Sequence, residues 1–529
     1  MHSPSPAPAR VSPADAARPT APGAPPLPPR IVDRTFPPEV FARRRQQVLD
    51  AMRAAGGGVA VIAAAPARIR SRDSDFTYRQ DSDFFYLTGF TEPDALLLLD
   101  SRGAGGPDAP SSTLFCREKD PAREVWAGFH YGPDAARQAF GFDAALPNGE
   151  RDARLAACLD GARTLFHPFH ADTGLDADIA RWIAAVRGRR GHRAPASRHD
   201  LTSVVEAMRI IKDTSELARM RDAAAISAQA HLRAMRAARP GLPEYALEAE
   251  LLYEFRRHGA QAPAYGSIVA AGANACILHY PAGDKVLADG DLVLIDAACE
   301  LDGYASDITR TFPANGRFSG PQRALYDIVV AANRAAADAT RPGARFTDGH
   351  QAALRVLVQG MFDTGLLRAD THGGVDDAIA ARAYTRFYMH STGHWLGLDV
   401  HDCGDYEERD EMNGEAASEA GMTNAAARDA ANPADAENTD GAAATGAALA
   451  TDAPARPAPP SRILRPGMVL TIEPGLYVRR ADDVPEAFWD IGIRVEDDAV
   501  VTESGCELIT RDVPVDADAI EALMREARC

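Results

Sequence analysis

Short apolar runs alternate with helical repeats along the first 200 residues of the chain. An early segment repeats apolar side chains at helical spacing, at Phe41, Val48, Leu49 and Met52, and two adjacent prolines before it suit a helix start. Further along, five apolar runs are each typical of a buried strand: GVAVIAAA, DFFYLTGF, DALLLLD, STLFCRE and TLFHPF. This alternation predicts an α/β domain over residues 31–204.

The pattern changes in the remainder of the chain. Residues 203–238 predict one or two helices, and residues 241–259 predict another that ends near Gly259. Four later segments predict strands and hairpins: SIVAAG, DLVLIDAACELDGYASDITRTF, MVLTIEPGLYV and IGIRVEDDAVVT. We therefore expect helices on a largely antiparallel sheet over residues 205–517, followed by a helix or tail over residues 518–529. The overall class is α/β in the broad sense, with an α+β second half.

Two segments lack the apolar residues that a packed core needs. Residues 1–30 are rich in proline and alanine, which predicts a disordered tail. Residues 405–460 contain 19 alanines, 12 acidic residues and three arginines, which predicts a disordered acidic insertion in a surface loop. A neutral expansion is the favoured interpretation of this insertion, and a regulatory or docking role is the alternative.

Composition narrows the class of protein. The formal net charge of −18 argues against general nucleic-acid binding. No uninterrupted apolar run reaches about 18 residues, so we expect no membrane span, and the chain start lacks the apolar core of a secretory signal. Seven cysteines without CxxC spacing predict reduced thiols and a cytoplasmic protein. The use of three lysines against 54 arginines is interpreted as coding bias.

Five polar residues stand at or near the ends of the apolar, strand-like runs: Asp296, Asp307, His394, Glu473 and Glu496. An unpaired carboxylate is costly beside a buried strand, so these acids need a counter-charge. Four carboxylates carry about four negative charges, which two divalent cations would balance. The pattern therefore predicts a site for two adjacent metal ions.

The spacing of these residues supports the prediction. Asp296 and Asp307 are eleven residues apart with Gly303 between them, so two strands joined by a turn would bring both acids together. The run DITRTF places Asp307 inside a strand. His394 lies in a histidine-rich stretch with His390 and His401, and such a cluster between glycines is typical of a functional site.

These segments resemble the metallopeptidase family with the pita-bread fold, which includes methionine aminopeptidase, prolidase and aminopeptidase P. The similarity extends to YRQDSDFFYLTGFTEPDA at 78–95 and GANACILHYPAGD at 272–284, which are most similar to bacterial aminopeptidase P. The resemblance implies an N-terminal creatinase/prolidase-like domain over residues 31–204. It also implies a pita-bread catalytic domain over residues 205–517, with a curved, largely antiparallel sheet covered by helices.

The resemblance implies a role for each metal-site residue. Asp296 would chelate one ion, and Asp307 and Glu496 would bridge both. His394 and Glu473 would complete the shell of the other ion. A carboxylate-rich site favours Mn²⁺, while Zn²⁺, Co²⁺ and Fe²⁺ remain open alternatives.

The resemblance also implies a substrate site around the metal ions. Glu473 would act as the general base, and histidines matching His279, His390 and His401 would surround the substrate. Four further positions match substrate-binding residues of the family: Tyr265, Arg462, Asp73 and Trp126. The last two would come from the N-terminal domain, often that of a neighbouring subunit, so a homo-oligomer (dimer or tetramer) is expected.

The implied activity is hydrolysis of the N-terminal Xaa–Pro bond of peptides by a water that the two metal ions activate. Prolidase, which cuts only Xaa–Pro dipeptides, is the nearest alternative. Methionine aminopeptidase is disfavoured because it lacks an upstream domain, and a metal-free relative is disfavoured because the ligand set is complete. A non-catalytic peptide-binding module on the same scaffold is the most remote alternative.

Overall fold

The computed structural model describes residues 36–103, 109–169, 173–408 and 460–527. The predicted tail over residues 1–30 lies outside the described residues, as does most of the predicted insertion, residues 409–459. Among the described residues, no helix combines the length and apolar character that crossing a bilayer requires.

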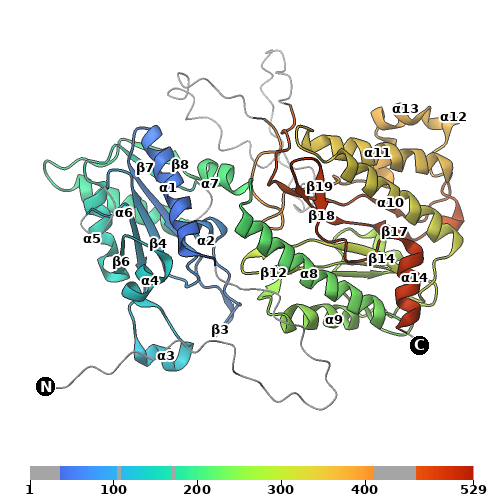
Figure 1. The fold of residues 1–529 in the computed structure, drawn as a ribbon, viewed down its shortest axis with the longest axis horizontal. Helices are drawn as coiled ribbons and strands as arrows, with labels where there is room; N and C mark the ends of the chain where they lie inside the picture. The colour runs from blue at the N-terminus through green and yellow to red at the C-terminus, as the bar shows by residue number, and fades with distance from the viewer. Residues whose placement is uncertain (1–35, 104–108, 170–172, 409–459, 528–529) are drawn as a thin grey trace, which may run out of the picture. The chain divides into compact units, whose positions relative to one another are not determined.

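The N-terminal domain is a six-stranded mixed sheet with helices on both faces (Figure 1). Its helices are α1 (Pro38–Ala54), α2 (Ser82–Thr88), α3 (Pro121–Ala127), α4 (Gly132–Phe140), α5 (Arg151–Leu159) and α6 (Thr173–Arg187). Its strands are β1 (Val59–Ala63), β2 (Ile69–Ser71), β3 (Ser74–Asp75), β4 (Leu96–Asp100), β5 (Ser112–Cys116), β6 (Ala144–Pro147), β7 (Thr164–His167) and β8 (Ser197–Asp200). The order in the sheet is β6-β5-β4-β1-β7-β8, and β4 runs antiparallel to both of its neighbours.

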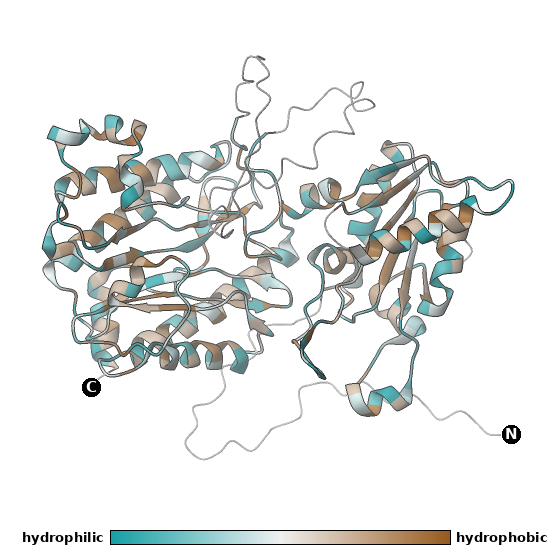
Figure 2. Cartoon of the chain, turned by 180° about the vertical axis from the view of Figure 1, so that it is seen from behind, coloured by the Kyte–Doolittle hydropathy of each residue, from teal (hydrophilic) through white to brown (hydrophobic). Residues whose placement is uncertain are grey.

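The continuous apolar runs arise because this sheet is buried on both faces. In β1, Ala60 and Ile62 pack with α1 and α2, whereas Val59 and Val61 pack with α5 and α6. Alternate residues of β4 divide between the same two cores. Figure 2 shows the result, with mostly hydrophobic strands and helices that mix hydrophobic and hydrophilic residues.

One predicted strand of this domain is wrong. The run DFFYLTGF forms α2 instead of a strand. The side chain of Asp81 caps the helix start by accepting the Phe84 N–H at 2.8 Å, and Gly89 ends the helix with a φ of 66°. Because almost every residue of α2 is buried, the run carries no helical periodicity, and a short apolar run then fits either element.

The C-terminal domain places helices against antiparallel strands, as predicted. Its helices are α7 (Thr202–Arg209), α8 (Thr214–Ala237), α9 (Glu244–Arg257), α10 (Gly320–Ala339), α11 (Phe346–Asp363), α12 (Ala369–His372), α13 (Val375–Ala380) and α14 (Ala517–Glu526). Its strands are β9 (Ala262–Pro263), β10 (Ile268–Ala271), β11 (Leu292–Asp296), β12 (Cys299–Leu301), β13 (Tyr304–Ala305), β14 (Thr309–Pro313), β15 (Val469–Ile472), β16 (Gly475–Val478), β17 (Ile491–Arg494), β18 (Asp497–Val501) and β19 (Cys506–Leu508).

Two groups of helices cover these strands. Helix α8 packs against β12 and β13, and α10 packs against β15, β16 and β17 (Figure 1). Every strand pair of this domain within the described residues is antiparallel. Helix α7 spans the predicted domain boundary at residues 204–205, so the exact boundary stays a prediction.

The two ends of the predicted insertion meet in space. The Glu408 N–H donates to the Pro460 carbonyl at 2.8 Å, and Glu407 pairs with Ser461 as an antiparallel bridge. Tyr406 stacks on Trp395 with ring centroids 5.6 Å apart. The first four residues of the segment predicted as a loop, up to Glu408, are thus part of the described fold.

Candidate active site

Nine of the predicted site residues gather in a cavity of about 1300 Å³, which the C-terminal domain lines together with Arg79 of the N-terminal domain. Its lining includes all five predicted metal ligands: Asp296, Asp307, His394, Glu473 and Glu496. It also includes four predicted substrate-site residues: Tyr265, His279, His390 and His401. A cavity of this size accommodates several residues of a peptide.

Strand pairing brings Asp296 and Asp307 together. Asp296 ends β11 and lies opposite Thr309 of the antiparallel strand β14. The prediction that Asp307 lies inside a strand is wrong, because it sits in the link 306–308 between β13 and β14. Its N–H donates to the Asp498 carboxylate at 3.1 Å. A carboxylate acceptor, and not a neighbouring strand, therefore fixes the backbone at Asp307.

The two glutamates are held by backbone hydrogen bonds at strand ends. Glu473 follows β15, and its N–H donates to the Thr392 carbonyl at 2.8 Å. Glu496 lies between β17 and β18, and its N–H donates to the Thr309 carbonyl at 3.0 Å. The Thr309 hydroxyl also donates to the Glu496 carboxylate at 2.5 Å. Both carboxylates line the cavity together with Asp307.

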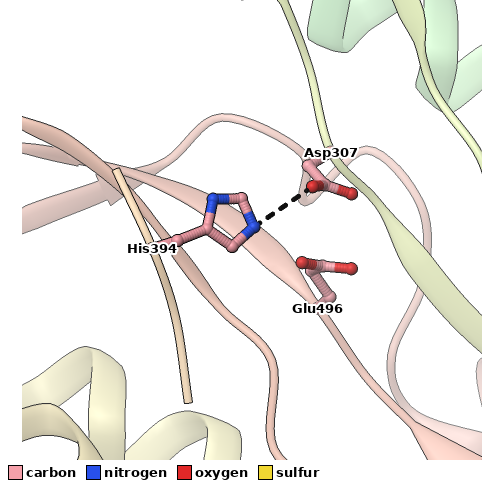
Figure 3. A group of neighbouring side chains, drawn as sticks. All are labelled: Asp307, His394 and Glu496. Atoms are coloured by element: carbon pink, nitrogen blue, oxygen red, sulfur yellow. Dashed lines mark ion pairs between the residues drawn. The ribbon is translucent and has the colours of Figure 1, made fainter. Parts of the chain in front are cut away.

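Three of these side chains converge closely enough to share one cation. Asp307, His394 and Glu496 each offer a ligand atom, and the three atoms lie within 4.8 Å of one another (Figure 3). His394 Nε2 is 3.5 Å from Asp307 and 3.7 Å from Glu473. His394 Nδ1 bonds the Trp395 carbonyl at 2.9 Å, which leaves Nε2 facing the carboxylates. This donor set fits a divalent metal ion.

The carboxylates are crowded and buried, which makes their charged forms costly. Burial raises the pKa of Glu496 well above its ordinary value, and the neighbouring carboxylates of Asp307, Glu473 and Asp296 raise it further. Burial likewise raises the pKa of Asp307 and raises that of Glu473 to about 7. A cation at this point would offset the repulsion.

The two histidines next to the carboxylates have opposite protonation tendencies. Burial lowers the pKa of His394, but Asp307 and Glu473 outweigh it and raise the pKa to about 9. Burial and the charge of Arg494 lower the pKa of His390 to about 3. His390 Nε2 lies 2.8 Å from the Tyr477 hydroxyl. At neutral pH His390 is therefore a neutral ring in this pocket.

Arg494 of β17 is a site residue that the sequence did not reveal. Its Nη2 donates to Asp296 at 2.5 Å, its Nη1 donates to the Tyr477 hydroxyl at 2.9 Å, and its Nε donates to the Thr309 hydroxyl at 3.1 Å. The signal for it was a charged side chain inside the apolar run IGIRV. Because the side chain is buried, it needs carboxylate partners, and it fixes the orientation of Asp296.

Tyr265 contacts the carboxylates directly. Its hydroxyl lies 2.6 Å from Asp296 Oδ1 and also hydrogen-bonds Asp307. Burial raises the pKa of Tyr265 well above its ordinary value, and both aspartates add to the rise. The phenol therefore stays protonated and donates to the acids that line the cavity.

We expect Tyr265→Phe to weaken divalent metal binding about 10- to 100-fold, because the hydroxyl orients two carboxylates. Titration of EDTA-stripped protein with Mn²⁺ measures this change. Tyr326→Phe is the matched control, since Tyr326 is buried and donates to the Val515 carbonyl at 3.0 Å, outside the cavity lining. Equal metal affinity in Tyr265→Phe and wild type would contradict the expectation.

Three other predicted positions lie apart from the carboxylates. Asp73 is exposed in the turn between β2 and β3, and Trp126 of α3 is 92% exposed. Neither lines the cavity within the described chain. Arg462 is half-buried and donates to the Asp405 carbonyl at 3.1 Å, next to Ser461 of the cavity wall.

Comparison with known proteins agrees with this fold and site. Residues 218–503 match the family described as metallopeptidase family M24, and residues 41–166 match the aminopeptidase P N-terminal domain. The chain is 40% identical over 491 residues to Xaa-Pro aminopeptidase of Escherichia coli (strain K12), covering 92% of this chain and 98% of the relative.

Solved structures give the same result. The structure of Pseudomonas aeruginosa aminopeptidase PepP aligns with a TM-score of 0.80 and 43% identity, covering 93% of this chain and 99% of that chain. Zn-substituted Escherichia coli aminopeptidase P in complex with product aligns with a TM-score of 0.79 and 40% identity, with the same coverage of both chains.

A carboxylate–imidazole cluster inside a cavity of this fold defines a metal-dependent peptide hydrolase. The chain belongs to metallopeptidase family M24 and carries the N-terminal domain of aminopeptidase P. The predicted fold class, an α/β domain followed by a pita-bread catalytic domain, is confirmed.

Proposed function

We propose that this protein is a metal-dependent aminopeptidase that hydrolyses the N-terminal Xaa–Pro bond of peptides. The observation that carries the proposal is the convergence of Asp307, His394 and Glu496 inside the cavity, in a chain that resembles Xaa-Pro aminopeptidases over nearly its whole length. Prolidase is not favoured by these relatives.

The metal centre of the proposal consists of two divalent ions, with Mn²⁺ favoured over Zn²⁺, Co²⁺ and Fe²⁺ because the donors are mostly carboxylates. The residues that would hold them are Asp296, Asp307, His394, Glu473 and Glu496. When bound, such ions lower the pKa of water and polarise the peptide carbonyl.

The protein's own residues supply proton transfer and orientation. Glu473 lines the cavity, with its carboxylate 3.7 Å from His394 Nε2, and is placed there to accept a proton from water and return it to the leaving nitrogen. His279, His390 and His401 lie around the same cavity, where imidazole rings can stabilise charge that develops on the substrate. Tyr265 and Arg494 orient Asp296 while this happens.

A dedicated enzyme for this bond has a physical basis. The proline nitrogen carries no N–H in a peptide, and the ring fixes the backbone dihedral φ. Peptidases that bind that N–H lose a contact with such substrates. A cavity that receives the ring offers an apolar contact in its place, and this cavity has apolar walls at Ile268, Leu278 and Val400.

We further propose that the protein acts in the cytoplasm as a homo-oligomer, a dimer or a tetramer. Support comes from α3, where Val125, Trp126 and nearby Phe129 are all exposed. Large apolar side chains grouped on one surface are typical of a contact between subunits. In such an assembly, Asp73 and Trp126 would reach the cavity of a second copy.

Two peptides test the proposed activity. Metal-reconstituted protein is expected to release the first residue from both an Xaa–Pro dipeptide and an Xaa–Pro–Xaa tripeptide, with Mn²⁺ giving the highest rate. EDTA-stripped protein provides the control. Cleavage of the dipeptide alone would move the assignment to prolidase, and no cleavage with any metal would support a binding module.

A further inference from the structure

A group of buried charges holds the loop that carries His401. We call residues 394–402 the His401 loop. Asp402, which ends this loop, is 6% exposed. Its Oδ1 accepts from Arg209 Nη2 at 2.5 Å, and its Oδ2 accepts from Lys212 Nζ at 2.9 Å. Both oxygens of the carboxylate are thus bound by buried cations at the residue that follows His401.

The N-terminal domain completes this group of charges. Arg209 Nη1 donates to Asp83 of α2 at 2.7 Å, and Arg209 Nη2 donates to Asp399 of the loop, also at 2.7 Å. The Ser82 hydroxyl of α2 donates to the other oxygen of Asp399 at 2.7 Å. Arg79 of the same domain donates to the Leu398 carbonyl. Charged and polar groups of the N-terminal domain therefore fix the loop at several points.

The loop has little room to move around Asp402. A Cβ atom at Gly397 would lie 2.2 Å from Asp402 Oδ2 and 3.0 Å from Lys212 Cε, so the loop backbone packs directly on the ion pair. The Asp402 N–H donates to the Trp395 carbonyl at 2.9 Å, which closes the loop on itself. The position of His401 at its end is consequently tied to the ion pair.

Stability alone is a weak explanation for this arrangement. Removing two cations and their carboxylates from water is expensive, and apolar residues of similar volume are often as stabilising. Lys212 is also one of only three lysines in the chain, and it is buried. Buried charges that bond several partners provide something that apolar packing does not, namely a fixed direction for each group.

We propose that Asp402 is a positioning residue for His401, and that it connects the active site to the N-terminal domain through Arg209 and Asp83. The inference rests on the proposed function, because it assigns His401 a place beside the substrate. The rings of His394 and His401 are in contact, with centroids 4.3 Å apart, so displacement of the loop end moves a ring that lies against the metal site.

Asp402→Asn tests the proposal, because it keeps the shape of the side chain and removes the charge that Lys212 binds. We expect kcat for an Xaa–Pro–Xaa peptide to fall about 10-fold or more, since small misplacements of a reacting group are costly. KM is expected to stay within about threefold of wild type, and metal content is expected to be unchanged.

A double-mutant cycle separates positioning from general destabilisation. If Asp402 acts through His401, then Asp402→Asn adds less than about a twofold loss of kcat in a His401→Ala background. Losses that multiply in the double variant would overturn the proposal, and so would a wild-type kcat in Asp402→Asn.

Glu216→Gln is the matched control. Glu216 is a buried acid of α8 that pairs with the buried Arg44 of α1 at 3.1 Å, and it does not line the cavity. Glu216 also links the two domains. The Glu216→Gln substitution should therefore lower the melting temperature while leaving kcat unchanged. If Asp402→Asn yields no soluble protein, Arg209→Lys replaces it in the same cycle, because lysine cannot bond Asp83, Asp399 and Asp402 together.

A second readout does not depend on hydrolysis. In NMR spectra of protein with ¹³C-labelled histidine, the His401 signal is identified by its loss in His401→Ala. We expect this signal to shift in Asp402→Asn and to stay in place in Glu216→Gln. An unmoved signal in Asp402→Asn would overturn the proposal. An inactive wild-type protein would refute the proposed function and leave this spectroscopic test of the loop in force.

Discussion

Replacement of Asp307 by Ala or of Glu496 by Gln is expected to abolish Xaa–Pro hydrolysis. Each of the two carboxylates contributes an atom to the group that converges with His394. Loss of such a ligand removes several kcal/mol of charge stabilisation, which corresponds to about 10³-fold or more in kcat. Steady-state kinetics of metal-reconstituted variants measures this loss, and near-normal turnover in either variant would refute the assigned site.

Although Glu496→Gln is expected to abolish hydrolysis, it should stabilise the metal-free protein. Because burial and neighbouring acids raise the pKa of Glu496, its ionised form is unfavourable in the folded state at neutral pH. Glu496→Gln removes that charge, so its melting temperature in EDTA is expected to exceed that of wild type. Glu216→Gln should lower the melting temperature instead, because the buried guanidinium of Arg44, which pairs with Glu216 at 3.1 Å, would lose that acid.

Metal removal is expected to abolish hydrolysis and to destabilise the protein more at high pH than at low pH. Glu473 has its pKa raised from 4.5 to about 7. Its penalty on folding is therefore absent below about pH 4.5 and complete above about pH 7.

His394 also makes the metal-free protein less stable as the pH rises. Its pKa is raised from 6.5 to about 9, so it contributes stability that is fully present below pH 6.5 and lost as the pH rises through 9. The metal-free protein should thus become less stable across the whole interval. A bound cation removes both of these pH dependences, because it neutralises the carboxylates and needs an unprotonated imidazole.

Thermal unfolding of EDTA-stripped and Mn²⁺-loaded protein at about pH 5 and about pH 8.5 measures this difference. The gap between the two melting temperatures is expected to widen with pH. A gap that stays constant or narrows as the pH rises would show that bound metal does not offset the repulsion among the carboxylates. Restoration of activity by added Mn²⁺ is the control for irreversible damage by EDTA.

The carboxylates of the site were predictable because each one interrupts or ends an apolar run. A charge at such a place is visible in the sequence. The resemblance to the metallopeptidase family then implied a role at the metal site for Asp296, Asp307 and Glu473. The link around Asp307 was not predictable, because its backbone is fixed by Asp498, a residue nearly 200 positions away.

Pairings between distant side chains were also beyond the sequence. Tyr265 was expected near the substrate, but its hydroxyl contacts two aspartates. Arg494 has partners on three different strands. The helix α2 was mistaken for a strand because burial on all sides erases periodicity. In each case the missing information was which groups meet in space, and that depends on the tertiary fold.

The hydrogen bond between Glu408 and Pro460 has a consequence for protein engineering. Glu408 and Pro460 lie next to each other in the described structure, and the entropy of closing a loop between two such points grows only slowly with its length. Sequence can therefore be exchanged there with little effect on the neighbouring strands. Since Glu407 and Ser461 line the cavity, a fluorescent domain inserted between them would sit beside the bound peptide and could report its arrival as a biosensor.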